Sequence, residues 1–383
     1  MLRDLVVVGA GPVGATLALG VANAGLDIVV LDARAAGTTL RGDRMLALSH
    51  GARLVFERLG IWPSLAADGG AVTPITSIDI SQAGGFGVTV LDAADHDVPA
   101  LGYVVAYRAL QAALDSALAE GGVAVRYDAA VTTVGGTPAY AAVTLAGGEL
   151  LTARLAVVAD GSGATVAGIA HGHREYDQVA LIAKVETDPP HGGRAYERFT
   201  PRGPLALLPE CDGYGLVWTM TAAAAKRALA LPDAQFLEEL AAAFGRHAGR
   251  FVSVGDRRTF PLGLTFARPT IGARCAVIGN AAQTLHPVAG QGFNLGLRDA
   301  HELAQAIVDT PRDALGDRAM LSAYERARRA DRLSGIAFTH GLVHLFGTEL
   351  PFVQWPRGLA LALLDAVPPA KRAFTRAMLF GVH

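Results

Sequence analysis

The chain has 383 residues, enough for one large domain or two closely joined domains around a substantial core. Hydrophobic residues make up 51% of it and charged residues 18%, which excludes intrinsic disorder and is typical of a soluble α/β protein. The formal net charge is -2, and no basic run with interleaved aromatic residues occurs. Nucleic acid is therefore excluded as an expected partner.

Cysteines and apolar stretches indicate the cellular setting. Cys211 and Cys275 lie far apart in the sequence and form no CxxC pattern, so we predict neither a disulfide framework nor a thiolate metal site. A cytoplasmic location fits this usage. Residues 5–26 are apolar, but their glycines predict a strand, a turn and a helix, and no other stretch is long enough to cross a bilayer.

The elements predicted from periodicity begin with a βαβ unit. Residues 5–8 and 28–31 are short apolar runs typical of buried parallel strands, and the segment between them is helical. Strands and exposed loops are predicted for residues 75–98, a helix for 110–118, and strands for 123–127, 139–145 and 155–158.

The second half of the chain continues with both kinds of element. Strands are predicted for residues 179–185, 216–220 and 275–278, and helices for 236–244 and 293–308. From residue 320 onward the pattern is helical, with breaks expected at Gly347, Pro351 and Pro356.

This order predicts an α/β fold with a discontinuous Rossmann-like nucleotide-binding domain, an inserted β-rich substrate domain and a C-terminal helical region. The nucleotide-binding domain is assigned residues 1–74, 99–172 and 265–319. The substrate domain is assigned residues 75–98 and 173–264, and the C-terminal helices residues 320–383.

A glycine motif follows the first predicted strand. Gly9, Gly11 and Gly14 form GxGxxG between a strand and a helix, and Asp32 ends the next strand. The first glycine permits a tight turn, the second lets the backbone approach a pyrophosphate, and the third allows close packing of helix and strand. In this context the motif predicts a bound dinucleotide, with Asp32 accepting hydrogen bonds from ribose hydroxyls.

Two further segments belong to strand-to-loop junctions. Asp160 and Gly161 follow the strand at 155–158, and taken alone they could be an ordinary turn. Residues 279–300 form a loop rich in glycine and small residues before a helix, which a purely structural loop explains poorly.

Several segments together resemble the class A flavoprotein aromatic hydroxylases, and within them the ubiquinone-biosynthesis hydroxylases, most closely the 2-octaprenyl-6-methoxyphenol hydroxylase type. They are residues 9–14 (GAGPVG) with Asp32, 44–49 (RMLALS), 158–161 (VADG), 198–209 (RFTPRGPLALLP) and 279–300 (GNAAQTLHPVAGQGFNLGLRDA). The resemblance covers nearly the whole chain, and residues 285–299 are its most specific part.

The resemblance implies FAD as cofactor and NADPH or NADH as electron donor. The glycine motif would hold the FAD pyrophosphate, and Asp32 and Arg44 the adenosine half. The cofactor residues that it implies are Gly9, Gly11, Pro12, Gly14, Asp32, Ala33, Arg34, Arg44, Arg108, Asp160, Gly161, Gly279, Asn280, Pro287, Gly290, Gln291, Gly292, Phe293 and Asn294. Asn280 stands where many relatives have aspartate, and Ala164 and Ala167 stand where much of the family has serine and arginine.

The implied reaction is hydroxylation of an aromatic ring by O2 through a C4a-hydroperoxide of the reduced flavin, with 2-polyprenyl-6-methoxyphenol as substrate. Pro287 and Gly290 would lie beside the flavin ring. His286 has two open interpretations, an acid–base group or a structural hydrogen-bonding residue. Substrate contacts are predicted at Phe199, Leu207, Trp218 and Val288, and no metal site is predicted.

The C-terminal region mixes apolar and basic residues at helical spacing, which suits either core packing or an interfacial helix. A polyprenylated substrate implies contact with a membrane surface, on the inner membrane face, or with a ubiquinone-biosynthesis complex. Two alternatives stay open: hydroxylation of a soluble aromatic compound, and a non-catalytic flavoprotein role in such a complex. A flavin halogenase is disfavoured because no WxWxIP-like motif occurs.

Overall fold

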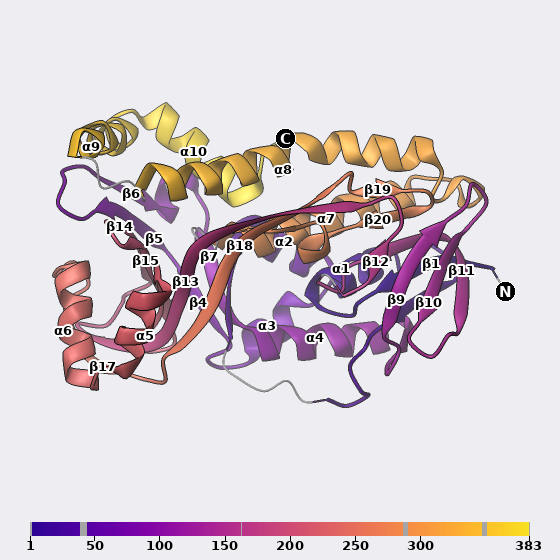
Figure 1. Ribbon diagram of the computed structural model, residues 1–383, viewed down its shortest axis with the longest axis horizontal. Coiled ribbons are helices and arrows are strands. Elements are labelled where there is room, and N and C mark those ends of the chain that lie inside the picture. The colour runs from indigo at the N-terminus through magenta and orange to yellow at the C-terminus, as the bar shows by residue number, and fades with distance from the viewer. Residues whose placement is uncertain (1, 39–43, 162, 286–289, 347–350, 383) are drawn as a thin grey trace.

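The computed structural model describes residues 2–38, 44–161, 163–285, 290–346 and 351–382, with the backbone alone for residues 339, 340, 342–346 and 351–354. Two large sheets occupy opposite ends of the molecule, and the long strands β13 and β18 run between them (Figure 1). The predicted α/β fold is confirmed.

The first large sheet has the strand order β12-β9-β10-β11-β1-β2-β8, and β20 pairs with β11 and β19. Its strands are β1 Leu2–Val8, β2 Ile28–Leu31, β8 Ala124–Arg126, β9 Val131–Gly136, β10 Ala141–Leu145, β11 Leu150–Val158, β12 Thr165–Val166, β19 Ile271–Gly272 and β20 Cys275–Val277. β1 pairs in parallel with both β2 and β11. Residues 5–8 of β1 are at most 2% exposed, which explains their continuous apolar run.

Three helices cover one face of this sheet and share its core: α1 Pro12–Gly20, α4 Tyr107–Glu120 and α7 Gln291–Val308. Leu17, Leu114 and Leu303 pack there against Val7 of β1. On the opposite face, Val6 of β1 shares a second core with Val134 of β9 and Val143 of β10. The strand ends that carry the glycine loops are thereby held on both sides.

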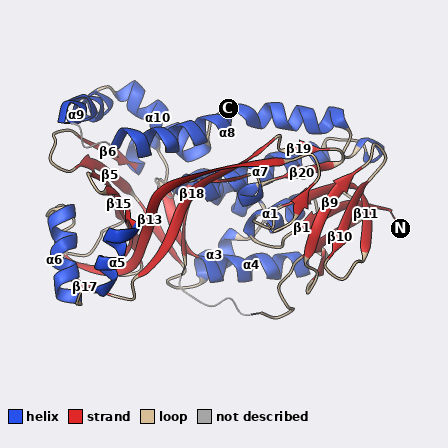
Figure 2. Cartoon of the chain, viewed as in Figure 1, coloured by secondary structure: helices blue, strands red, loops and turns tan. Residues whose placement is uncertain are grey.

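The second large sheet has the order β21-β18-β13-β16-β15-β14-β5-β6, and β17 pairs with β13. Its strands are β5 Ser77–Gln82, β6 Val88–Asp92, β13 Ala170–Asp188, β14 Arg194–Thr200, β15 Gly203–Glu210, β16 Gly213–Thr221, β17 Arg250–Val254, β18 Arg258–Arg268 and β21 Gln283–Thr284. Helices α5 (Ala222–Ala230) and α6 (Asp233–Phe244) cover one face of it (Figure 2). These two helices leave the other face of the sheet uncovered, so a binding site can form there.

A small antiparallel sheet, β3-β7-β4, lies between the two large ones. Its strands are β3 Met45–Ser49, β4 Val72–Ile75 and β7 Gly102–Ala106, and the neighbouring helices are α2 His50–Arg58 and α3 Trp62–Ala67. Short 3-10 helices are η1 Ala93–His96, η2 Gly279–Ala281 and η4 Arg312–Ala314.

The chain ends in three helices, α8 Arg318–Phe346, α9 Pro351–Ala366 and α10 Pro368–Phe380. The break expected at Pro356 is wrong, because Pro356 lies inside α9. It stands in the second turn, where a proline removes one hydrogen bond near the helix start, and packing of α9 on β6 offsets that cost. No helix in the described ranges is long and apolar enough to cross a membrane.

The predicted domain boundaries stay a proposal. β5 does pair with β14, from residues 170–268, and β6 pairs with β5, as an inserted substrate domain requires. The boundaries proposed at 172/173 and 264/265 fall inside β13 and β18, which are shared by the two ends of the molecule.

Candidate active site

The loop between β1 and α1 brings three stretches of backbone together. Gly9 has φ +99°, and a Cβ atom there would lie 2.8 Å from the carbonyl oxygen of Ala159. A Cβ atom on Gly14 would overlap the carbonyl oxygen of Gly9. Nothing lies within 4 Å of the position that a Cβ on Gly11 would take. Packing therefore explains the first and third glycines, and Gly11 borders open space at the start of α1.

This open space suits an anion. Gly11 is the N-cap of α1 and Pro12 is its first residue, and no side chain caps the helix. The unpaired N–H groups and partial positive charge of a helix N-terminus favour a phosphate at such a place.

Asp32 holds the same loop from the end of β2. Its Oδ2 accepts a hydrogen bond from the Ala10 backbone N–H at 2.6 Å, and its Oδ1 accepts from the Arg34 N–H at 2.8 Å. Asp32 is 7% exposed. The carboxylate therefore orders the loop directly, and its remaining lone pairs can serve a ribose hydroxyl.

Gln111 of α4 is a polar residue that the sequence analysis missed. Its Nε2 donates to the Ala10 carbonyl oxygen and to Asp115 Oδ1, both at 2.8 Å. Its Oε1 is buried and has no hydrogen-bond partner in the described part of the chain. A buried acceptor beside this loop fits a ligand or water that donates a hydrogen bond. The signal was a glutamine among the apolar positions Leu110 and Leu114.

Three of the residues predicted to contact the cofactor at this end of the site are arginines. Arg34 bonds to Asp32 and Asp115. Burial opposes its protonation, but these two carboxylates outweigh burial and raise the pKa of Arg34. Arg44 stacks over the Tyr107 ring, with 5.6 Å from Cζ to the ring centroid, and Arg108 is exposed in the first turn of α4.

The remaining predicted positions of this end are Ala33, Asp160 and Gly161. Ala33 is exposed directly after Asp32. Asp160 Oδ2 accepts a hydrogen bond from the Ala164 N–H at 2.8 Å, and Gly161 follows with φ +85°. The Asp160 turn lies against Gly9, since a Cβ on Gly9 would come within 2.8 Å of the Asp160 Cα.

The predicted loop at residue 279 meets α1 and α7. Gly279 has φ +60°, and a Cβ there would lie 3.0 Å from Cγ1 of Val13. A Cβ on Gly296 would lie 2.9 Å from the Gly279 Cα. Asn280 is exposed in this turn. Through these contacts the site extends from the start of α1 to the start of α7.

The start of α7 is fixed to β3 by Asn294. The Asn294 Nδ2 donates to the carbonyl oxygens of Ala47 (3.0 Å) and Gly290 (2.8 Å), and its Oδ1 accepts from the Ser49 N–H (2.8 Å). The side-chain amide is thus occupied by the protein, which assigns Asn294 a positioning role. Gly290, the N-cap, has φ +60° and no side chain caps the helix.

The half-buried Gln291, Gly292 and Phe293 form the first turn of α7, and Gln291 lines a cavity described below. His286, Pro287 and Val288 lie outside the described residues.

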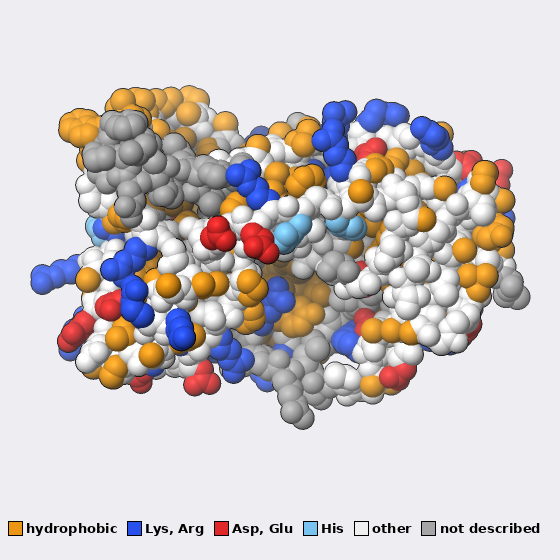
Figure 3. All heavy atoms as spheres, viewed as in Figure 1, with side chains coloured by type: hydrophobic (Ala, Val, Ile, Leu, Met, Phe, Trp, Pro, Cys, Tyr) orange, Lys and Arg blue, Asp and Glu red, His pale blue; other side chains and the backbone are white. Residues whose placement is uncertain are grey.

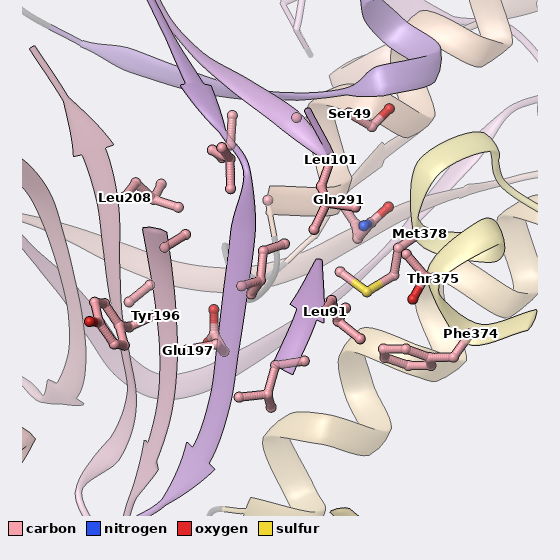
Figure 4. Close-up of a pocket in the computed structure, with 18 of the residues that line it drawn as sticks. Ser49, Leu91, Leu101, Tyr196, Glu197, Leu208, Gln291, Phe374, Thr375 and Met378 are labelled. Carbon is pink, nitrogen blue, oxygen red and sulfur yellow. The ribbon is translucent and has the colours of Figure 1, made fainter. Parts of the chain in front are cut away.

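A cavity of about 280 Å³ lies between β3, the uncovered face of the second large sheet, the start of α7, and helices α9 and α10. Its walls are mainly apolar. Figure 4 shows Gln291 and Ser49 approaching from one side, Leu208 and Glu197 from the sheet, and Phe374 and Met378 from α10. An apolar cavity with a few polar groups is typical of a small-molecule site.

Two predicted substrate residues need correction. Leu207 and Trp218 are 0% exposed, and both lie in the core against α5 and α6, on the opposite face of the sheet. Because side chains alternate along a strand, Ala206, Leu208 and Val217 face the cavity instead. Phe199 does line the cavity.

Figure 3 shows a hollow in the middle of the visible face, in which hydrophobic and Lys or Arg side chains gather.

In the parts of the chain that the structure describes, no group of three or more His, Cys, Asp or Glu side chains could hold a metal ion.

Comparisons with known proteins agree with this site. The family model described as FAD binding domain matches residues 3–333. Ubiquinone hydroxylase UbiL of Rhodospirillum rubrum is 35% identical, over 98% of this chain and 89% of the relative. The chain belongs to the FAD-binding monooxygenase family. The predicted FAD cofactor and hydroxylase class are thereby confirmed.

Two more comparisons extend this result. The 3-demethoxyubiquinol 3-hydroxylase of Escherichia coli is 30% identical to this monooxygenase, over 96% of each chain. The crystal structure of p-nitrophenol 4-monooxygenase PnpA from Pseudomonas putida matches with a TM-score of 0.78 and 18% identity, over 100% of this chain and 99% of that one. The second likeness shows the fold alone.

The residues present fit FAD. The space beside Gly11 is open at an uncapped helix N-terminus, and Gln111 offers an unpaired buried acceptor nearby. Val13, Gly279 and Gly296 connect this place to the second uncapped helix, α7. An elongated dinucleotide has a continuous set of partners from Asp32 to Gln291.

Proposed function

We propose that this monooxygenase hydroxylates the ring of a polyprenylated phenol in ubiquinone biosynthesis, with FAD, O2 and NADPH or NADH as electron donor. The observation that carries the proposal is the apolar cavity directly at the N-terminus of α7. The named activities of the UbiL and Escherichia coli relatives support this substrate class. The most specific candidate is the 2-polyprenyl-6-methoxyphenol that the sequence resemblance implies.

The size and lining of the cavity support a substituted ring. About 280 Å³ is near the lower end of small-molecule sites, roughly 300 to 1,000 Å³, so the cavity suits a ring with the first part of a tail. Ile78, Ile80 and Leu91 supply apolar walls that exclude water from the reacting ring. Glu197, Ser49 and Gln291 are among the polar side chains of the lining, and each can orient a phenol hydroxyl.

FAD, when bound, supplies the electron transfer and the activation of O2. The protein supplies position and electrostatics. Asn294 fixes the start of α7 to β3, so the positive end of this helix stays directed at the cavity. That end stabilises negative charge on a group bound there. We propose that, of the described residues, Gly290 and Gln291 lie nearest the reacting ring. We propose that His286 and Pro287 of the preceding segment also act at this ring.

We also propose that the enzyme meets its substrate at a membrane surface, on the inner membrane face, or in a ubiquinone-biosynthesis complex, because a long prenyl tail is insoluble in water. The cytoplasmic location predicted from cysteine usage fits either setting.

The proposal is tested by profiling quinone intermediates in cells that lack this protein. We expect a polyprenylated phenol to accumulate, and wild-type protein to restore the quinone. Gly11→Asp should fail to restore it, because the new carboxylate fills and charges the phosphate site. Gly147→Asp is the matched control, since Gly147 is exposed with open space around it. Unchanged quinone levels in the deletion strain would overturn the proposal and favour a soluble aromatic substrate.

A further inference from the structure

The outer face of α9 carries an exposed apolar stripe. Trp355, Leu359 and Leu363 of α9, and Val367 directly after the end of this helix, stand at intervals of four residues and are 73%, 53%, 52% and 43% exposed. Residues four apart lie on one face of a helix. We call these four residues the α9 stripe. Single exposed apolar residues need no explanation, but a contiguous row indicates an interaction surface.

The β5–β6 connection extends this surface. Phe86 is 42% exposed and its ring contacts that of Trp355 edge to face, with 5.0 Å between centroids. Val88 of β6 is 41% exposed. Figure 3 shows hydrophobic side chains gathering over α9 at the upper left of the molecule.

The α9 stripe is held firmly in place. Thr89 Oγ1 donates a hydrogen bond to the Leu361 carbonyl oxygen at 2.7 Å. A Cβ atom on Gly87 would overlap the Gly358 carbonyl oxygen, so α9 and the β6 end are in backbone contact. The surface is therefore formed before any partner arrives.

Exposed positive charge lies on α10, which follows α9 in the chain and contacts it. Arg372 and Arg376 are exposed on α10, four residues apart, and no ion pair to either is found in the described part of the chain. Asp365 is the sole acidic residue in the sequence from 355 to 382. It is paired with Lys371, with 2.9 Å between Oδ1 and Nζ. We call these exposed arginines of α10, the helix that contacts α9, the basic border of the apolar surface.

The inner face of the same helix lines the cavity. Leu361 and Leu364 of α9, with Phe374 and Met378 of α10, form its wall. An α-helix is about 10 Å across, so the cavity and the α9 stripe are separated by one helix.

We propose that the α9 stripe docks this monooxygenase on an anionic phospholipid surface, where the prenyl tail of the substrate stays among the acyl chains while the ring enters the cavity. The role given to the prenyl tail rests on the proposed function, whereas the docking of the α9 stripe on lipid does not. An exposed tryptophan with aliphatic neighbours suits the boundary between headgroups and acyl chains, and the basic border complements anionic lipid. This charge pattern favours a bilayer over a second copy of the chain, whose border would be equally basic.

The test uses the full-length FAD-loaded protein and vesicle sedimentation. Phosphatidylcholine vesicles with and without phosphatidylglycerol are compared for the wild type and for a variant combining Trp355→Ser, Leu359→Ser and Leu363→Ser. The control is Leu229→Ser with Val252→Ser, two exposed apolar residues in α5 and β17, away from the α9 stripe. We expect binding to the anionic vesicles to fall about tenfold or more in the α9 variant and to persist in the control. Arg372→Glu with Arg376→Glu should abolish the preference for phosphatidylglycerol.

Several results would overturn the docking proposal. One is that the wild type stays in the supernatant with both kinds of vesicle, and another is that the α9 variant binds vesicles as well as the wild type does. A third is that the wild type forms a dimer and the α9 variant is a monomer. Hydroxylation of a phenol with a single prenyl unit is measured in parallel. If the protein hydroxylates this phenol but does not bind vesicles, only the docking proposal is overturned. If it hydroxylates no prenylated phenol, the proposed function is overturned.

Discussion

A Cβ atom on Gly14 would overlap the carbonyl oxygen of Gly9, so the first turn of α1 lies against the end of β1 with no room for a side chain. The position of Gly11 differs, because a Cβ there meets no atom within 4 Å. The same motif thus contains glycines needed for packing and a glycine that leaves space for a ligand. Substitutions at the two kinds of position should have different effects.

Gly14→Ala should destabilise the protein itself. The added methyl group forces α1 away from β1, and overpacking of this kind costs about 1 to 3 kcal/mol in the free energy of unfolding. Urea unfolding of the apo protein measures it. Gly147→Ala, in open space, should change this free energy by less than about 0.5 kcal/mol. Equal stability of the two variants would contradict the packing observed at Gly14.

Gly11→Val should lower the free energy of unfolding of the apo protein by no more than about 1 kcal/mol, because its side chain enters open space and only the N-cap preference for glycine is lost. Its flavin content after purification should fall about tenfold or more, since the valine occupies the place of the phosphate. Absorbance of bound flavin per protein is the measurement, with Gly147→Val as control. Full flavin content in Gly11→Val would show that the phosphates bind elsewhere.

Asp331 should make the stability depend on acid pH. Burial opposes its ionisation, but the hydrogen bond from Arg298 and the charges of Arg298 and Arg328 outweigh burial and lower the pKa of Asp331. A lowered pKa contributes stability above the unfolded-state value of about 3.9, and this contribution is lost as pH falls through the folded-state pKa.

Asp331→Asn should therefore be less stable than the wild type by about 3 kcal/mol at neutral pH, because two arginines lose their buried anion. The difference should shrink as pH falls below about 4. Urea unfolding between pH 7 and pH 3 measures it, with the exposed Asp95→Asn as control. A difference that stays constant over this range would mean that the ionisation of Asp331 is not its source.

Ala206→Phe should impair substrate binding and leave FAD in place. Ala206 lines the cavity from β15, so a phenyl ring there takes space that the substrate ring needs. We expect the KM for a prenylated phenol to rise about tenfold or more, with unchanged flavin content. Ala222→Phe at the exposed start of α5 is the control. A normal KM in Ala206→Phe would place the substrate outside this cavity.

Local signals explain what the sequence predicted well. The buried runs at residues 5–8 and 28–31 lie in β1 and β2, and the helix between them is α1. A strand, a glycine turn and a helix are coded by neighbouring residues, so their order is readable without the fold. A helix was likewise expected after the glycine-rich loop, from residue 293, and α7 begins two residues earlier at Gln291. The pairing of Asn294 with β3 was not expected.

Tertiary relationships explain the rest. Alternation along β15 and β16 shows that neighbouring residues face opposite sides, but which side holds the cavity depends on where α5 and α6 pack. Leu207 and Trp218 were therefore assigned to the wrong face. The buried network of Arg298, Arg328 and Asp331 joins α7 to α8. Arg328 and Asp331 have helical i, i+3 spacing, but no sequence pattern links Arg298 to them.

The most direct measurement of ring hydroxylation follows the oxygen atom. The purified FAD-loaded enzyme is given a prenylated phenol, NADPH or NADH, and isotopically labelled O2, and the product is analysed by mass spectrometry. The account predicts a phenol that carries one labelled oxygen on its ring, with none from labelled water. Consumption of the nicotinamide without a hydroxylated product, or an unlabelled product, would contradict it.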